Sequence, residues 1–333
     1  MTGTAGTAAS QPTTRCLVVA NPAAGSADPD LIGRILSTTR VLADSVRVHR
    51  TTAPGDATRV VAQAADSGVD APEVVLVIGG DGTVREAAEG IARAARPGPR
   101  PALLIAPAGT GNSVHRALWG DLPWPEVLRT ALGTRATVIR RLDVAWAADR
   151  ERAVGGRAVG ERAVLLGAAT GFVAEVTARA RELAEVAGRE RYHRAMGEVL
   201  PTYRPYPGRV TVDGTVLHKG PTTMALVGGA RHRVGTFNVL PCSELDDGLL
   251  DICVIDGDLG TAERDELALH IMAGTHLGRR GVHYAQGRHV LLERTDALPL
   301  TFEHDGELWP SAPRSVELRV SPGAVPALAP AQR

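Results

Sequence analysis

The chain has 333 residues, of which 44% are hydrophobic and 22% are charged, and these proportions are ordinary for a globular protein. At roughly 150 residues per domain, this length predicts two domains, each able to bury its own core. The 37 basic residues balance the 37 acidic ones. That balance argues against a dedicated nucleic-acid binder, which would carry a basic domain or stripe.

Residues 1–14 contain neither a basic cluster nor an apolar core, so we expect a disordered tail and no secretory signal. The three cysteines, Cys16, Cys242 and Cys253, lack paired spacing for zinc, and their odd number does not suit a disulfide framework. A reducing cytoplasm is the expected location. The aliphatic runs are far shorter than the roughly 20 residues needed to span a bilayer.

Short aliphatic runs alternate with helical patterns through the first half of the chain. This alternation predicts a parallel sheet covered by helices. The strands are expected over residues 17–20, 46–48, 74–78 and 103–106.

Near Leu142 the pattern changes to shorter strand-like segments, which are separated by turns rich in Gly, Pro and Asp. This pattern predicts a mainly β second half. One long helical insert is expected near residues 173–200. The Pro- and Ala-rich stretch after Ser321 predicts a loosely held, flexible tail. Strands are expected over residues 210–212, 224–227, 250–255 and 290–292.

The segment from Val74 to Ile91 reads VVLVIGGDGTVREAAEGI, an apolar run that ends in glycines and passes into a helix. Thr83 and Glu86 have capping-box spacing, which predicts a helix N-terminus with free amides that bind an anion. The glycines would let the backbone approach phosphates, and Asp81 beside them is tolerable only if it holds a cation, most naturally Mg²⁺. A strand-to-helix turn without any ligand explains the same residues.

Residues 102–118 read ALLIAPAGTGNSVHRAL, again a strand, a glycine turn and a helix. Ligands of open α/β sheets bind outside the carboxyl ends of the strands, so both loops should converge on one crevice. Lys219 is the only lysine and lies far from either loop, which excludes a Walker-type loop and a protein-kinase lysine. Backbone amides, arginine and metal would have to bind the phosphates.

Five motifs occur in order: NPAAG at residues 21–25, GGDGT at 79–83, PAGTGN at 107–112, LDDGLLD at 245–251 and HDGE at 304–307. The ordered set resembles the diacylglycerol kinase catalytic-domain family, which includes sphingosine kinases and bacterial soluble lipid kinases. GGDGT alone also occurs in NAD kinases and phosphofructokinase relatives. A metabolite kinase of the NAD kinase type therefore stays an alternative.

The resemblance implies a lipid kinase that uses ATP and Mg²⁺ to phosphorylate a lipid hydroxyl, with diacylglycerol as the first expectation and a sphingoid base or another lipid alcohol as alternatives. It implies a three-layer α/β ATP-binding domain over residues 15–141 and a β-sandwich-like lipid domain over 142–313, with a cleft between them. Residues 314–333 would return to the first domain. A regulator with little activity is a further alternative, because NPAAG lacks a following basic residue and Ser113 replaces a carboxylate.

The resemblance also implies residue roles. Glu307 would be the general base, while Asp81 and Asp143 would organise magnesium and water around the phosphates. A solvated turn carboxylate is the alternative for Glu307. The family's ATP contacts fall on Asn21, Thr51, Gly79, Gly80, Asp81, Gly82, Thr83, Val84, Arg85, Thr110, Gly111 and Asn112.

A structural magnesium would lie near the DDGLL turn, bound by Asp247 and the carbonyl groups of Glu244 and Leu249. A hairpin turn without metal is the alternative reading of these residues.

The expected partner is a lipid substrate at a membrane surface, with no nucleic acid and with a homodimer as one option. Residues 174–203 carry five arginines with interleaved glutamates, so this run could rest on the inner face of an anionic membrane or be a solvated helix face. His270, His276 and His283 lack an i, i+4 ligand pair, and we expect no metal site from them.

Overall fold

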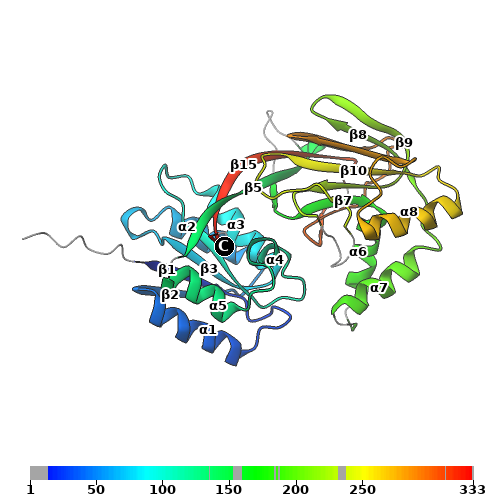
Figure 1. Cartoon of the computed structure of the whole chain (residues 1–333). Coiled ribbons are helices and arrows are strands. Elements are labelled where there is room, and N and C mark those ends of the chain that lie inside the picture. The colour runs from blue at the N-terminus through cyan, green and yellow to red at the C-terminus, as the bar shows by residue number, and fades with distance from the viewer. Residues whose placement is uncertain are drawn as a thin grey trace, which may run out of the picture.

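The computed structural model describes residues 14–134, 136–152, 160–183, 185–186, 188–231, 238–311 and 313–331. The predicted N-terminal tail lies almost entirely outside these residues. Two lobes are joined by a long antiparallel ribbon of β5 (Thr137–Asp149) and β15 (Ser315–Pro330), which Figure 1 shows running from one lobe into the other.

The first lobe contains the predicted parallel sheet, in the order β4-β3-β1-β2. β3 is buried at every residue, because it has strand neighbours on both sides and helices on both faces, and this burial explains its unbroken apolar sequence. β2, at the edge, is mostly exposed. The strands are β1 (Arg15–Ala20), β2 (Ser45–Arg50), β3 (Val74–Gly79) and β4 (Ala102–Pro107).

Helices cover both faces of this sheet, as predicted. In Figure 1, α1 and α5 lie together on one face, whereas α2 and α3 lie on the other. The side chain of Asp28 accepts a hydrogen bond from the amide of Leu31 and so caps α1. The helices are α1 (Pro29–Leu42), α2 (Asp56–Ala65), α3 (Asp81–Arg93), α4 (Ser113–Trp119) and α5 (Trp124–Leu128), with 3₁₀ turns at Gly68–Asp70 and Arg150–Arg152 and a π-helical turn at Arg129–Thr134.

The second lobe is mainly antiparallel β, as predicted. β8 alternates between buried and half-buried residues, which is the pattern of a strand with one face on the core. The strands are β6 (Arg162–Val164), β7 (Gly167–Gly171), β8 (Tyr206–Val212), β9 (Thr215–Gly228), β10 (Leu250–Asp256), β11 (Val282–Gly287), β12 (His289–Arg294), β13 (Phe302–His304) and β14 (Glu307–Leu308), and α8 spans Thr261–Ala273.

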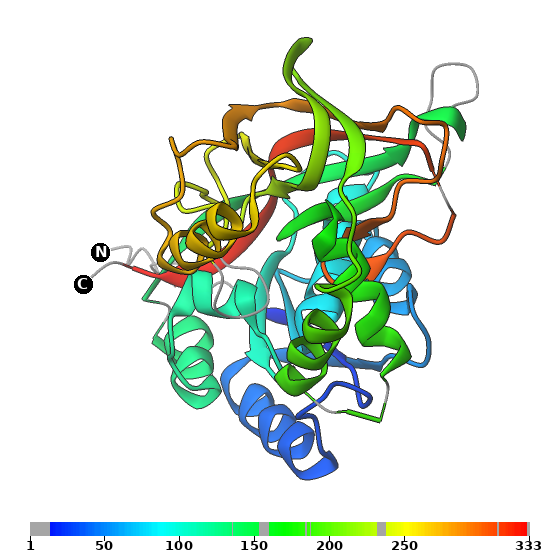
Figure 2. The same ribbon diagram turned by 90° about the vertical axis from the view of Figure 1, so that its right-hand side faces the viewer.

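The predicted single helical insert is two helices, α6 (Phe172–Glu182) and α7 (Gly188–Val199), which lie side by side in Figures 1 and 2. The first helix, α6, ends at Glu182 because the next residue, Leu183, has a non-helical ψ of 47°. Gly188, where α7 begins, has a positive φ of 63°. Arg179 and Arg194 both pair with Glu198. These pairings within the insert favour the solvated-face interpretation, and membrane contact stays a prediction.

The predicted loose tail after Ser321 is wrong. β15 continues to Pro330, and its pairing with β5 shifts register between Ser321 and Val325 and then resumes. Ala327 is fully buried and lies opposite Leu103 of β4, so the segment reaches the sheet of the first lobe. The small alanines that suggested a tail instead allow close packing at this position.

The lobes also share a hydrophobic core. Leu165, Leu166 and Leu245 of the second lobe are buried in the same cluster as the strands of the first. The predicted boundary between residues 141 and 142 falls inside β5, which runs through both lobes. The ribbon and this cluster together set how the lobes face each other.

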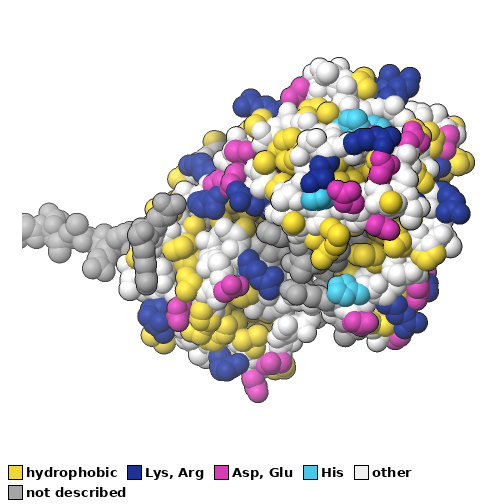
Figure 3. Space-filling view, turned by 45° about the vertical axis from the view of Figure 1, so that its right-hand side comes forward, with side chains coloured by type: hydrophobic (Ala, Val, Ile, Leu, Met, Phe, Trp, Pro, Cys, Tyr) yellow, Lys and Arg dark blue, Asp and Glu magenta, His cyan; other side chains and the backbone are white. Residues whose placement is uncertain are grey.

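Figure 3 shows one face of the molecule, on which basic and acidic side chains are interspersed between hydrophobic ones. No helix in the described part of the chain is both long enough and apolar enough to cross a bilayer. The three cysteines are free; Cys16 and Cys253 are buried, and Cys242 is exposed.

A substitution tests the role of β15. We expect Ala327→Asp to lower the free energy of unfolding by about 3 kcal/mol or more, because it buries an unpaired carboxyl group. Ala331→Asp, at an exposed residue just past the strand, should change it by less than about 0.5 kcal/mol. Urea denaturation followed by circular dichroism measures both, and equal stability of the two variants would contradict the strand's role.

Candidate active site

Two glycine loops meet at the carboxyl ends of β3 and β4, as predicted. Gly80 precedes α3 and Gly109 lies between β4 and α4. A Cβ atom on Gly109 would lie 2.4 Å from the Cα of Gly80, and one on Gly80 would lie 3.1 Å from the Cα of Gly109. The two backbones therefore touch, and Gly109 in particular has no room for a side chain.

A hollow of about 450 Å³ opens beside this contact, within the usual range for small-molecule sites. Residues within 21–25, 51–54, 80–86 and 109–110 of the first lobe line it, and Glu307 enters from the second lobe. No lysine or arginine is among its lining residues in the described structure. Its polar groups are main-chain groups, hydroxyls, one amide and two carboxylates.

Asn21 attaches the NPAAG loop to the GGDGT loop. Its Nδ2 donates to Thr83 Oγ1 at 2.9 Å, and its Oδ1 accepts from the amide of Ala23 at 2.9 Å. A Cβ on Gly79 would lie 2.8 Å from the Cβ of Thr83, which explains glycine at the end of β3. Asn21, Thr83 and Thr51 all line the hollow, and their contact with ATP, which the resemblance implied, stays a prediction.

The predicted capping box of Thr83 and Glu86 is wrong. The helix α3 begins at Asp81 with Gly80 as its N-cap, so Thr83 lies inside the first turn instead of before it. The Glu86 carboxylate instead accepts from the amides of Gly55 and Ala57, at 2.8 and 3.2 Å, and caps α2. Among the described residues, no side chain caps α3.

This uncapped terminus lies at the hollow, because Gly80, Gly82 and Thr83 all line it. The first amides of a helix have no partner within the helix, and the helix dipole places roughly half a positive charge there. The arrangement therefore fits an anion such as a phosphate group.

Asp81 does not line the hollow. Its Oδ1 accepts from the amide of Val114 at 3.2 Å, and its Oδ2 lies 2.7 Å from where a Cβ on Gly111 would be. Asp81 thus links the start of α3 to the start of α4. Asn112, at a φ of 53°, exchanges hydrogen bonds with the main chain of Gly109 and closes the second loop.

Of the remaining predicted ATP contacts, Thr110 lines the hollow. A Cβ atom on Gly25 would lie 2.9 Å from the Thr110 hydroxyl oxygen, so the two loops lie close together here. Val84 is buried in the core, and its amide bonds the carbonyl group of Gly80. The structure therefore gives Val84 a packing role inside α3.

Glu307 reaches the first lobe from β14. Its Oε1 lies 3.2 Å from Nη2 of Arg85 and would lie 3.9 Å from a Cβ on Gly82. Its Oε2 lies 4.0 Å from Nη1 of Arg162. Arg85 is buried and also pairs with Glu89 at 3.3 Å. The structure thus brings Glu307 and the GGDGT loop together. Arg162 was not among the predicted site residues, because it belongs to none of the motifs.

The turn before Glu307 is held by Asp305. Asp305 and Gly306 take positive φ values of 48° and 81°, and the Asp305 carboxylate accepts from the amides of residues 165, 166 and 167 at 2.9, 2.8 and 3.1 Å. His304 is fully buried and packs edge-on against Trp309. The first three residues of HDGE therefore position the turn, and Glu307 faces the hollow.

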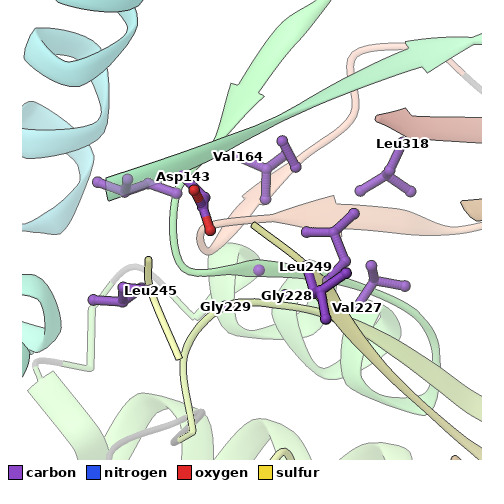
Figure 4. A pocket seen from close by; sticks show the side chains of 12 residues that line it. Asp143, Val164, Val227, Gly228, Gly229, Leu245, Leu249 and Leu318 are labelled. Atoms are coloured by element: carbon purple, nitrogen blue, oxygen red, sulfur yellow. The ribbon is translucent and has the colours of Figure 1, made fainter. Parts of the chain in front are cut away.

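Asp143 lies away from the hollow, at the junction shown in Figure 4. Its two oxygens accept from the amides of Gly248 and Gly323, each at 2.7 Å, which ties β5 to the DDGLL turn and to β15. Burial raises the pKa of Asp143. These contacts give it a positioning role, and its predicted role beside the phosphates stays a prediction.

The predicted magnesium ligands lie on the DDGLL turn, near Asp143 and not at the hollow. Asp247 is exposed, and its Oδ1 accepts from the amide of Leu249 at 2.9 Å. The Glu244 carboxylate pairs with Arg231. The amides of Gly248 and Leu249 in this turn are thus bound by the carboxylates of Asp143 and Asp247, and the metal stays a prediction.

Comparison with known proteins decides the family. Residues 15–146 match the model of the diacylglycerol kinase catalytic domain, and residues 167–329 match that of the YegS C-terminal NAD kinase beta sandwich-like domain. A diacylglycerol kinase of Mycobacterium tuberculosis is 31% identical over 277 residues, which are 83% of this chain and 82% of the relative. The chain belongs to the diacylglycerol kinase catalytic-domain family. It is a phosphotransferase of the lipid-kinase class, and kinases of this family use ATP.

Solved structures confirm the fold of this lipid kinase. A diacylglycerol kinase from Bacillus anthracis superposes with a TM-score of 0.65 at 20% identity, over 95% of this chain and 97% of the other. Yeast NADH kinase complexed with NADH gives a TM-score of 0.53 at 9% identity, over 97% of this chain and 85% of the other. At these identities the likeness concerns the fold alone.

A glycine substitution tests the link between the two loops. We expect Gly111→Ala to lower kcat/KM for ATP by about tenfold or more, because its Cβ would displace the Asp81 carboxylate. Gly33→Ala is the matched control: it lies in α1 with nothing within 4 Å of its Cβ, so it should keep full activity. Steady-state kinetics measure both, and wild-type kinetics in Gly111→Ala would contradict this packing.

Proposed function

We propose that this kinase transfers the γ-phosphate of ATP to the hydroxyl group of a lipid, with diacylglycerol as the first candidate acceptor and Mg²⁺ as the cation. One observation carries the proposal: Glu307, from the second lobe, lies against the uncapped N-terminus of α3. This juxtaposition supports the proposal, because a carboxylate that can accept a proton lies beside helix amides that suit a phosphate group.

The first lobe fits a nucleotide without any lysine. The touching glycines allow phosphates close to the main chain, and the α3 amides supply donors without a competing side chain. Because no basic side chain lines the hollow in the described part of the chain, we assign most of the charge neutralisation to a divalent cation. Asp81, the first residue of α3, does not line the hollow and would act on that cation through water.

The second lobe supplies the base. Arg85 and Arg162 approach opposite oxygens of Glu307, so the carboxylate is oriented while its remaining lone pairs stay available. Glu307 accepts the proton of the acceptor hydroxyl as the acceptor oxygen bonds to the γ-phosphorus. The bond between that phosphorus and ADP breaks, and the proton later leaves Glu307 for solvent.

The acceptor is tested directly. Purified chain is incubated with Mg²⁺, γ-³²P-labelled ATP and mixed micelles that contain diacylglycerol, monoacylglycerol, ceramide or sphingosine, with NAD⁺ in a parallel reaction. We expect labelled phosphatidic acid as the main product. Label in a different lipid would correct the acceptor, and NADP formation with no labelled lipid would contradict the lipid assignment.

A conservative variant tests the base. Glu307→Gln keeps an oxygen for Arg85 but cannot take up a proton, so we expect kcat to fall about a hundredfold or more while the Kd for ATP changes less than threefold. Glu266→Gln, at an exposed glutamate on α8, serves as the matched control and should keep wild-type kcat. Wild-type turnover by Glu307→Gln would remove Glu307 from the chemistry.

A further inference from the structure

Two histidines and an aspartate, side chains of the types that can bind a metal ion, converge in the second lobe, outside the hollow. His218 Nδ1 lies 3.2 Å from Asp256 Oδ1, and His283 Nε2 lies 2.8 Å from the same oxygen. The three ligand atoms all lie within 4.8 Å of one another. In the part of the chain that the structure describes, this is the one such group of three His, Cys, Asp or Glu side chains.

Strand pairing brings these residues together from distant parts of the sequence. His218 lies on β9, Asp256 ends β10 and His283 lies on β11, and β10 pairs with both neighbours. A register irregularity at Ile255 and Asp256 occurs where β10 ends. The site needs no i, i+4 pair, which is why local histidine spacing could not reveal it.

Hydrogen bonding holds the ring of His218 in place. Its Nε2 lies 2.9 Å from Thr222 Oγ1, and that hydroxyl group also lies 3.0 Å from the carbonyl oxygen of Gly220. Its Nδ1 faces the Asp256 carboxylate at 3.2 Å. A neutral imidazole can present a lone pair at Nδ1, so this nitrogen can bind a metal ion together with the carboxylate.

We propose that His218, Asp256 and His283 bind a divalent transition-metal ion of the zinc class. Metal–ligand bonds of about 2.0–2.1 Å in a tetrahedral centre separate neighbouring ligand atoms by about 3.3 Å. The distance of 3.2 Å between His218 and Asp256 matches this value, and the distance of 2.8 Å between His283 and Asp256 would have to lengthen slightly on binding. Two imidazoles and one carboxylate are a zinc donor set with one position left for water. The Thr222 contact fixes the ring of His218 from behind.

The site is open to solvent on one side and anchored on the other. The side chains of His283 and Asp256 are 36% and 28% exposed, whereas that of His218 is 6% exposed. The main chain of Asp256 is fixed by hydrogen bonds to Gly281 and Thr223. An ion entering from solvent would therefore join three strands that are already in place.

The site differs in kind from the nucleotide hollow. None of its three residues lines that hollow or contacts Glu307. Magnesium prefers an all-oxygen octahedral set, so the ATP cation should not compete for two imidazoles. The ion would hold β9, β10 and β11 together, whichever lipid accepts the phosphate group.

The test uses the full chain after dialysis against a chelator. Isothermal titration calorimetry with Zn²⁺ should show one tight site. The melting temperature should rise by several degrees with one equivalent of Zn²⁺ but not with millimolar Mg²⁺. His283→Ala and Asp256→Asn should each weaken this binding at least a hundredfold. His193→Ala, at an exposed histidine on α7, is the matched control and should bind as the unchanged chain does.

Circular dichroism melts without metal check that each variant is folded, and anomalous diffraction at the zinc edge locates the ion. Zinc density between His218, Asp256 and His283 would support the proposal. Absence of a tight site, or equal binding by His283→Ala and His193→Ala, would overturn it.

Discussion

The ion pair between Arg85 and Glu307 joins residues separated by 222 positions in the sequence and sets the geometry of the site. Arg85 is buried in α3 and is also fixed by Glu89, so the guanidinium group has little freedom. A buried ion pair often adds little net stability, because both charges lose their hydration. Its value here is positional: it holds the proposed base beside the helix terminus that suits a phosphate.

Two further sets of contacts support that position. Asp305 accepts three main-chain amides and fixes the turn that carries Glu307. Asp143 connects β5 with the DDGLL turn and with β15, so the ribbon between the lobes is held where it enters the second lobe. These contacts hold the two lobes in place on either side of the hollow.

Much of the fold could be predicted from local patterns. The strands of the first lobe are short apolar runs that end in turns, and their burial on both faces makes this signal strong. The meeting of the GGDGT loop with Glu307 was implied by the resemblance to the family, not by a local pattern. Contacts between distant residues were not predictable in this way: Thr83 is engaged by Asn21, 62 residues away, and the residues after Ser321 pair with β5 despite a composition typical of a tail.

A crystal structure with a non-hydrolysable ATP analogue and Mg²⁺ tests the central claim most directly. The account predicts that the terminal phosphate lies over the amides of Gly82 and Thr83, with the Glu307 carboxylate facing it across a gap that fits one hydroxyl group. A nucleotide bound elsewhere, or a Glu307 side chain that stays turned away from the terminal phosphate, would contradict it.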